Sequence, residues 1–256
     1  FEILPISYFN DCNDGTIKLH VKFACLDRYF DDMLKLVKET VTTTSFEKNE
    51  PIVDIIKQSR RYLYQAIVSS GSLIATQRAL TSSSYDNVCM ELTLGYGYYQ
   101  WLKEQEENHM DFAELDGYMK KVFGNDNVIF SIANDNADML EPIAAEFISS
   151  LDKSDFAHNL VIKPWQKKNE AIIIPGDIAF SGMGGRLTDA YNGISNLACH
   201  IASYDYLWNE VRVKGGAYGC GVRVNTNGTI GANSYRDPNA VQSVKTFLNI
   251  GEYLSE

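Results

Sequence analysis

The sequence predicts an α+β protein in which helices pack on one face of a mainly antiparallel sheet. Two observations lead to this class. Strand-like alternation gives way to helical periodicity through residue 151, in the order strand, helices, strand, helix, and a second, shorter unit then repeats the style. The 256 residues are 45% hydrophobic, which is enough for one large domain or two domains of ordinary size.

The first unit opens with a strand that has one apolar face. Alternate positions from Ile17 to Cys25 are apolar, whereas Lys18, His20 and Lys22 lie on the other face. This alternation is typical of a half-buried antiparallel strand. We therefore expect His20 to be a solvated surface residue.

Helical periodicity follows the first strand. Apolar residues from Phe30 to Val41 recur on one helical face, and Pro51 suits the first turn of the next helix. The aromatic residues near Trp101 are expected to be packing residues. We expect helices over 30–41, 51–70, 72–80, 85–107, 111–122 and 137–151, and a second strand over 127–134.

A polar stretch over 152–170, with Pro164 and little periodicity, predicts a domain boundary. We expect a first α+β domain over 1–155, a linker over 156–169, and a second α+β domain over 170–256 that is incomplete at its C-terminus. Both ends of the sequence look cut, so we expect a piece of a longer protein.

The second domain is expected to contain a strand over 170–185, a mostly helical stretch over 185–212, and a hairpin that turns at Asn227-Gly228. In the last helix, Asp237 can cap the N-terminus and Pro238 can occupy the first turn. The apolar stripe expected to face the core of the long helix consists of Leu197, Ile201, Tyr204, Leu207, Trp208 and Val211.

Charge and cysteine content narrow the possible partners and compartments. The net charge of −10 disfavours a general nucleic-acid binder, and no apolar run is long enough to span a membrane. We therefore expect neither nucleic acid nor membrane as a partner. Five widely spaced cysteines without a CxxC motif indicate reduced thiols, and so a cytoplasmic location or an organelle matrix in a eukaryote.

Common catalytic motifs are missing from the sequence. His20, His109, His158 and His200 form no H-E-x-x-H or H-x-x-E-H pair, so no catalytic metal is expected in this chain. His109 and His158 are expected to be solvated, and His200 to be a satisfied core or interface histidine. The glycine-rich stretches match neither a phosphate-binding loop nor a dinucleotide fingerprint.

The segment from Tyr206 to Pro238 concentrates unusual chemistry in a short space. Arg212 falls in the last turn of a helix, where a cation is favourable, and Gly215-Gly216 can end that helix. Tyr218 follows directly, and Gly219 and Gly221 in the next strand suggest that something approaches the backbone closely. The segment is either a tight corner of the fold or a binding surface.

The segment YLWNEVRVKGGAYG, followed by SYRDP, resembles the C-terminal half of pitrilysin/insulinase-type zinc metallopeptidases, in particular the presequence-protease branch. The resemblance extends more weakly through SSGSLIATQRAL, LTLGYGYYQWL and GRLTDAYNG over essentially the whole chain. It implies LuxS/insulinase-like α+β domains, two halves that close around a chamber, and zinc bound by the N-terminal half.

The resemblance also implies roles for individual residues. The family's arginine and tyrosine fall on Arg212 and Tyr218, which would bind the substrate and stabilise the tetrahedral intermediate of peptide hydrolysis. Gly215, Gly216 and Gly219, with Lys214, are candidate substrate-binding residues. Zinc would belong to the intact metalloendopeptidase and not to this chain, whose partners would be unstructured oligopeptides and the zinc-bearing half.

Two alternatives remain open from the sequence. The chain can be a non-catalytic peptidase-like subunit that acts with a zinc-bearing partner, or a free-standing peptide-binding module. In either case the chain alone is expected to be inactive as a protease.

Overall fold

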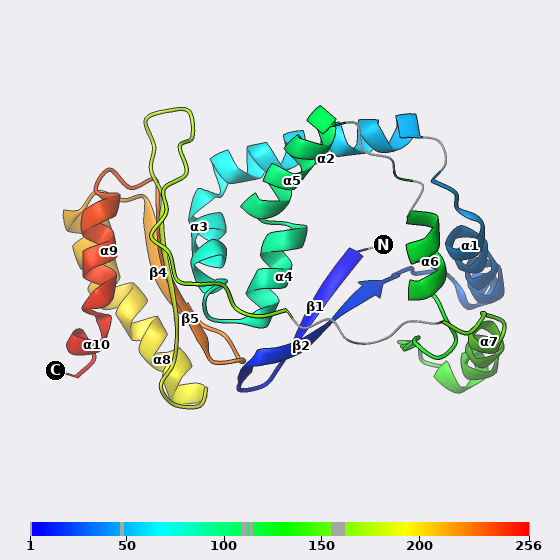
Figure 1. Ribbon diagram of the computed structural model, residues 1–256. Helices are drawn as coiled ribbons and strands as arrows, with labels where there is room; N and C mark the ends of the chain where they lie inside the picture. The colour runs from blue at the N-terminus through cyan, green and yellow to red at the C-terminus, as the bar shows by residue number, and fades with distance from the viewer. Residues whose placement is uncertain (1, 47–48, 109–111, 113–114, 155–161, 256) are drawn as a thin grey trace. The chain divides into compact units, whose positions relative to one another are not determined.

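The computed structural model describes residues 2–46, 49–108, 112, 115–154 and 162–255 (Figure 1). The chain forms two compact units, each assembled from separate segments. The first, called here the helical unit, contains residues 1–2, 19–57 and 105–160, and the second, called the sheet unit, contains residues 3–18, 58–104 and 161–256. The predicted linker over 156–169 lies partly outside the described residues, and the predicted boundary stays a prediction.

Four elements run through both units. They are the strands β1 (Glu2–Tyr8) and β2 (Asp11–His20), which form a two-stranded sheet, and the helices α2 (Asn49–Ser69) and α5 (Tyr96–Asn108). Pro51 lies in the first turn of α2, as predicted. The strand expected to reach Cys25 ends at His20 instead.

The helical unit is built around aromatic side chains. A short η1 (Asp27–Tyr29) leads into α1 (Phe30–Thr43), which contacts α6 (Leu115–Val122) and α7 (Ala137–Ser149). The expected strand over 127–134 is wrong, because the structure places these residues in no strand. Their apolar side chains serve the core instead. Phe30, Leu34 and Leu140 are buried there, with Phe23, Phe130, Ile132, Ile143 and Phe147 packed around them.

The sheet unit contains a three-stranded antiparallel sheet. β3 (Ser181–Arg186), β4 (Gly219–Val224) and β5 (Thr229–Tyr235) are ordered β3-β5-β4. β4 and β5 form the predicted hairpin, with Gly228 at φ +90° in the turn, a conformation that glycine adopts easily. The α+β class with antiparallel sheets and helices is therefore confirmed.

Helices cover both faces of this sheet, one more face than predicted. On one face lies α3 (Gly71–Leu80), against β3 and β5. The other face carries α8 (Gly193–Ile201), η2 (Ala202–Lys214), α9 (Ala240–Leu248) and α10 (Ile250–Tyr253). Figure 1 shows α3 and α8 on opposite sides of β4 and β5. The core of the second face consists of Cys199, Ala202, Leu207, Val211, Ala217, Val222, Ala232, Phe247 and Ile250.

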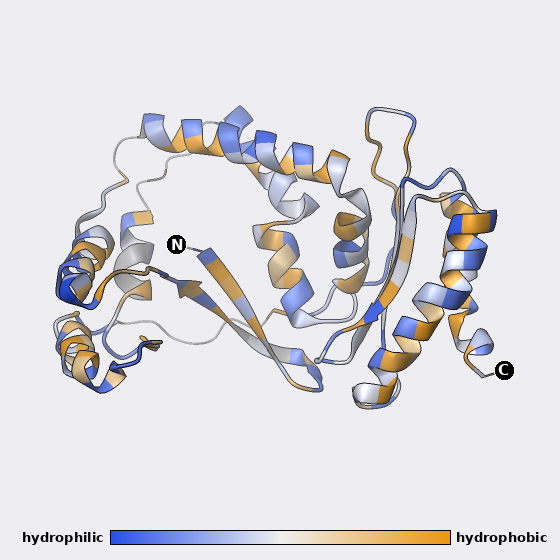
Figure 2. Cartoon of the chain, turned by 180° about the vertical axis from the view of Figure 1, so that it is seen from behind, coloured by the Kyte–Doolittle hydropathy of each residue, from blue (hydrophilic) through white to orange (hydrophobic). Residues whose placement is uncertain are grey.

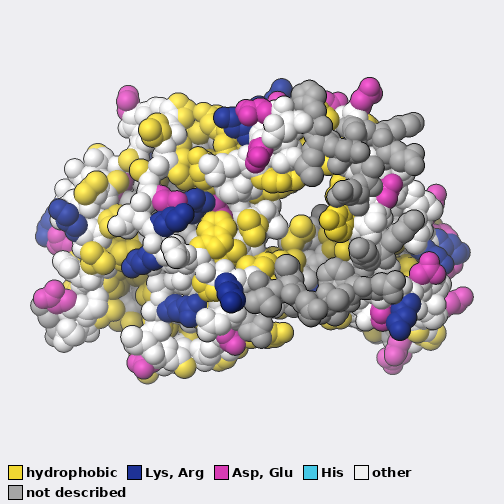
Figure 3. Space-filling view, in the orientation of Figure 1, with side chains coloured by type: hydrophobic (Ala, Val, Ile, Leu, Met, Phe, Trp, Pro, Cys, Tyr) yellow, Lys and Arg dark blue, Asp and Glu magenta, His cyan; other side chains and the backbone are white. Residues whose placement is uncertain are grey.

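The expected strand over 170–185 forms only at its C-terminal end, as β3. Pro175 has no N–H for a ladder, and Gly176 has φ +105°, so the backbone turns out of the extended conformation there. Ile173 is 97% exposed. Figure 3 shows apolar side chains reaching the surface at several places, with charged side chains of both signs between them.

The long helix after β3 buries a different stripe from the predicted one. Leu207 and Val211 are buried as expected, whereas Leu197, Ile201 and Tyr204 are 58%, 45% and 66% exposed. The reason is that η2 is a π-helix, whose i→i+5 bonds add a residue to each turn and shift the row of side chains that faces the sheet. Orange segments recur along α8 and η2 in Figure 2.

The single helix predicted over 85–107 is two helices, α4 (Tyr85–Thr93) and α5. The break follows from Glu91, whose side chain is completely buried and packs against Gly95. Its Oε1 accepts the Gly97 N–H at 2.8 Å, so that Glu91 satisfies a free donor at the start of α5. Within the described ranges, no helix is long and apolar enough to cross a membrane.

Candidate functional site

The candidate site forms where η2 ends and β4 begins. Gly216 has φ +80°, and its N–H donates to Arg212 O at 3.0 Å, while Ala217 N–H donates to Val211 O at 3.1 Å. Glycine reaches this left-handed conformation without the steric cost that other residues meet. The tight turn brings Arg212, at the end of the helix, close to Tyr218, just before the strand.

The guanidinium of Arg212 lies between two aromatic rings. Its central carbon is 4.0 Å from the centre of the Trp208 ring and 5.8 Å from the centre of the Tyr218 ring. Within the described part of the chain, Arg212 forms no ion pair or hydrogen bond with a carboxylate. Contacts to ring faces hold the cation and leave the N–H donors at its edge available for a ligand.

Tyr218 combines a fixed backbone with an open side chain. Its N–H donates to Tyr235 O at 3.0 Å and to Arg236 O at 3.3 Å, and its ring meets the Tyr235 ring edge-on at 6.1 Å. The side chain is nevertheless 68% exposed. A phenol in this position can donate a hydrogen bond to a ligand bound beside Arg212.

The remaining predicted site residues divide into two groups. Gly215 and Gly216 form the turn, and Gly215 O accepts from Asn239 Nδ2 at 2.8 Å. Lys214 is mostly exposed and pairs with Glu210 at 2.6 Å, one helical turn earlier. Gly219 begins β4, where a side chain would meet only Tyr235 Cβ, at an ordinary 3.8 Å. Of these residues, Gly219 and Lys214 have space around them for a ligand.

The close approach expected at the β4 glycines has an occupant. Ser203 of η2 bonds the outer edge of this edge strand, accepting from Val222 N–H at 3.0 Å and donating to Val222 O at 3.1 Å. A side chain at Gly221 would lie 3.7 Å from Ser203 Oγ. The edge of β4 is therefore covered at Val222.

Buried polar groups beside the site complete its surroundings. Asp237 is fully buried; its Oδ1 accepts the Asn239 N–H at 2.8 Å, which caps the turn before α9 much as predicted. Burial raises the pKa of the Cys220 thiol, and the nearby Arg212 opposes that rise while Asp237 adds to it. Cys220 is thus a packing thiol.

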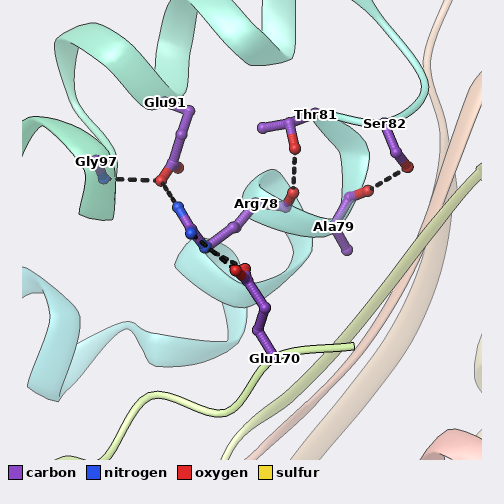
Figure 4. A network of polar contacts seen from close by, with 7 residues as sticks. All are labelled: Arg78, Ala79, Thr81, Ser82, Glu91, Gly97 and Glu170. Atoms are coloured by element: carbon purple, nitrogen blue, oxygen red, sulfur yellow. Dashed lines mark hydrogen bonds and ion pairs between the residues drawn. The ribbon is translucent and has the colours of Figure 1, made fainter. Parts of the chain in front are cut away.

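Sequence reasoning did not anticipate a second polar cluster, drawn in Figure 4. Arg78 donates to Glu91 Oε1 at 2.5 Å and to Glu170 Oε2 at 2.6 Å, and it lies 5.4 Å from the Tyr96 ring centre. Burial raises the pKa of Glu91, whereas the hydrogen bonds from Arg78 lower the pKa of the more exposed Glu170. No sequence motif links these three residues, which come from distant segments.

The histidines and cysteines offer no ligand set for a metal. Across the described residues, no group of three or more His, Cys, Asp or Glu could hold a metal ion, so the residues present do not fit a zinc site. His20 lies on the surface beside Glu2, at 2.8 Å. His200 is exposed and stacks on Tyr204 at 4.6 Å, so the expectation of a core position for it is wrong; His109 and His158 lie outside the described residues.

Two family models match the chain. A model of the domain associated with subfamily C of the pitrilysin/insulinase-type peptidases matches residues 1–104, and the model described as "PreP C-terminal domain" matches residues 169–256. The second match contains the whole turn from Arg212 to Tyr218.

Curated proteins of three kinds are similar to the chain. Protein HypA of Clostridium perfringens is 29% identical over 246 residues, which cover 93% of this chain and 25% of that protein. The mitochondrial presequence protease of Eremothecium gossypii is 25% identical over 88% of this chain and 24% of its own length. Presequence protease 1, chloroplastic/mitochondrial, of Arabidopsis thaliana is 24% identical over 88% of this chain and 22% of its own length. The chain therefore spans about a quarter of the length of these relatives.

Proposed function

Because the chain belongs to the presequence-protease branch of the pitrilysin/insulinase-type peptidases and corresponds to the C-terminal half of such a member, we propose that it forms the substrate-binding wall of a zinc metalloendopeptidase. The observation that carries the proposal is the state of Arg212. Its guanidinium is held by two rings and bonded to no carboxylate of the described chain, so its donors are available to a peptide.

In this proposal, Arg212 and Tyr218 act on the charge that develops during peptide hydrolysis. Attack of water on a peptide carbonyl turns the carbonyl oxygen into an oxyanion, and donors already aimed at that oxygen stabilise the transition state more than the substrate. The Arg212 N–H groups and the Tyr218 hydroxyl are such donors. Zinc, held by the N-terminal half outside this chain, supplies Lewis-acid activation of the water.

The substrates in this proposal are unstructured oligopeptides enclosed in a chamber between the two halves. Lys214 and Gly219 are the substrate contacts that the local geometry leaves accessible, since Gly219 faces only ordinary van der Waals neighbours. Gly215 and Gly216 support the site indirectly, because they form the turn that brings Arg212 to Tyr218.

Reconstitution tests the proposal. This chain is mixed with a separately expressed zinc-bearing half, and cleavage of a fluorogenic peptide is followed for the wild type, Arg212→Ala, Arg212→Lys and Tyr218→Phe. Removing one oxyanion donor should lower kcat by roughly 10²–10³-fold. The matched control is Arg223→Ala, which removes an exposed arginine from β4 in the same hairpin.

Each outcome assigns a different role to the chain. Loss of activity in the Arg212 and Tyr218 variants, with association intact and Arg223→Ala unaffected, supports a catalytic wall. Full activity of every variant means that the turn is only a corner of the fold and that the chain is a non-catalytic subunit. Peptide affinity of this chain alone, unaffected by the zinc-bearing half, indicates a free-standing binding module.

A further inference from the structure

Trp208 touches the group on which the proposed function depends. The centre of its ring lies 4.0 Å from the Arg212 guanidinium carbon, closer than the ring of Tyr218 at 5.8 Å. We infer that Trp208 is a positioning residue, which holds Arg212 in the orientation needed to meet the substrate oxyanion. This inference rests on the proposed function and adds to it a residue with no donor of its own aimed at the reaction.

Arg212 needs such a support because arginine is a flexible side chain. A free guanidinium samples many rotamers, and fixing it costs conformational entropy at the moment when the substrate binds. In the described chain, the other contact that could restrain the guanidinium is the more distant ring of Tyr218. Without Trp208, the entropy of ordering Arg212 would have to be overcome during catalysis.

An aromatic ring restrains a guanidinium differently from a carboxylate. A carboxylate takes up two of the N–H donors, as Glu170 does at Arg78. A ring stacks on the face of the guanidinium and leaves the donors at its edge unused. The contrast between Arg78 and Arg212 within one chain fits a structural role for the former and a ligand-binding role for the latter.

Core packing does not account for Trp208. Its side chain is 39% exposed, whereas its neighbour Leu207 is completely buried and belongs to the core on that face of the sheet. The π-helical winding of η2 turns Leu207 inward and leaves Trp208 at the surface, one turn before Arg212. A large apolar ring at the surface is costly to expose, and its contact with Arg212 gives it a use.

A double-mutant cycle in the reconstituted peptidase tests the inference, with Trp208→Ala, Arg212→Ala and the double variant. Cation–π contacts of this kind correspond to a roughly 3–30-fold effect. Trp208→Ala should lower kcat by that factor with a smaller change in KM, and Trp208→Phe should restore most of the loss. In the Arg212→Ala background, Trp208→Ala should have no further effect. The matched control is Trp101→Ala, which removes a tryptophan of similar exposure, 42%, that stacks on Tyr98.

The cycle separates the two ways of failing. If Arg212→Ala lowers activity but Trp208→Ala does not, or if the two effects multiply, the positioning role is overturned and the proposed function stands. If Arg212→Ala leaves activity unchanged, both are overturned. Urea unfolding of each variant checks folding, and a Trp208→Ala chain that fails to fold moves the decision to Trp208→Phe and Trp208→Leu, of which only the aromatic variant should keep kcat.

Discussion

Arg78 reaches a carboxylate that is wholly removed from water, with Nη1 lying 2.5 Å from Oε1 of the buried Glu91. Removing one member of a buried ion pair leaves an uncompensated charge, which typically costs about 3–5 kcal/mol. We therefore expect Arg78→Met to lower the free energy of unfolding of the sheet unit by about that amount in urea titrations. Glu170→Gln is the control; its partly exposed carboxylate contributes less, about 0–1 kcal/mol.

The same pair predicts a pH dependence. Burial raises the pKa of Glu91 and Arg78 opposes the rise, so loss of Arg78 raises that pKa further. A raised folded-state pKa means that the native state binds the proton more tightly than the unfolded state. Native stability therefore grows as pH falls through that pKa and declines as pH rises through it. The destabilisation caused by Arg78→Met should shrink between pH 7.5 and pH 5.

The double variant Arg78→Met/Glu91→Gln serves as the control for this titration. It has no carboxylate at position 91, so the gap between it and wild type should change much less with pH. A gap for Arg78→Met that stays constant or widens on acidification would show that Glu91 is not the group responsible.

These two residues also mark the limit of what the sequence predicts. The helix periods of α1, α2, α3 and α7 were readable because each helix buries one regular stripe. The break between α4 and α5 was not, because it follows from a tertiary contact of Glu91 with Gly95 and Gly97. A local pattern carries no information about a carboxylate that folds over the following turn.

A second prediction concerns close packing between α3 and the sheet. A Cβ on Gly182 would overlap the backbone of Thr76, whereas a Cβ on Gly185, in the same strand, would meet only Ile230 Cγ2 at 4.0 Å. Gly182→Ala should therefore push α3 from the sheet and cost about 1–3 kcal/mol, as overpacking does. Gly185→Ala should be nearly neutral.

Thermal unfolding of the two variants, side by side, checks this prediction. Equal melting temperatures for Gly182→Ala and Gly185→Ala would mean that α3 does not pack on β3 as closely as described. The strand glycines were noticed in the sequence, but the identity of the approaching group depends on which helix covers the second face.

The candidate site was predictable in part. Arg212 and Tyr218 were singled out by sequence, and the glycine turn does bring them together. Trp208 was assigned instead to a buried stripe, because α-helical spacing was assumed where η2 winds as a π-helix. An aromatic residue four positions before a catalytic candidate was the available signal, and it indicates a cation–π pair only when the winding is known.

The last prediction separates the two roles proposed for the glycines of the turn. Gly216 has φ +80°, so Gly216→Ala forces a side chain into the left-handed region at a cost of roughly 1–2 kcal/mol. This variant should lose stability, and should lose activity because Arg212 and Tyr218 are no longer held together. Gly219→Ala has room for its methyl group, 3.8 Å from Tyr235 Cβ, so its unfolding should match wild type. If Gly219 lies against a bound peptide, that methyl group should raise KM in the reconstituted peptidase at unchanged kcat. An unchanged KM would remove Gly219 from the substrate contacts and leave the glycines a purely conformational role.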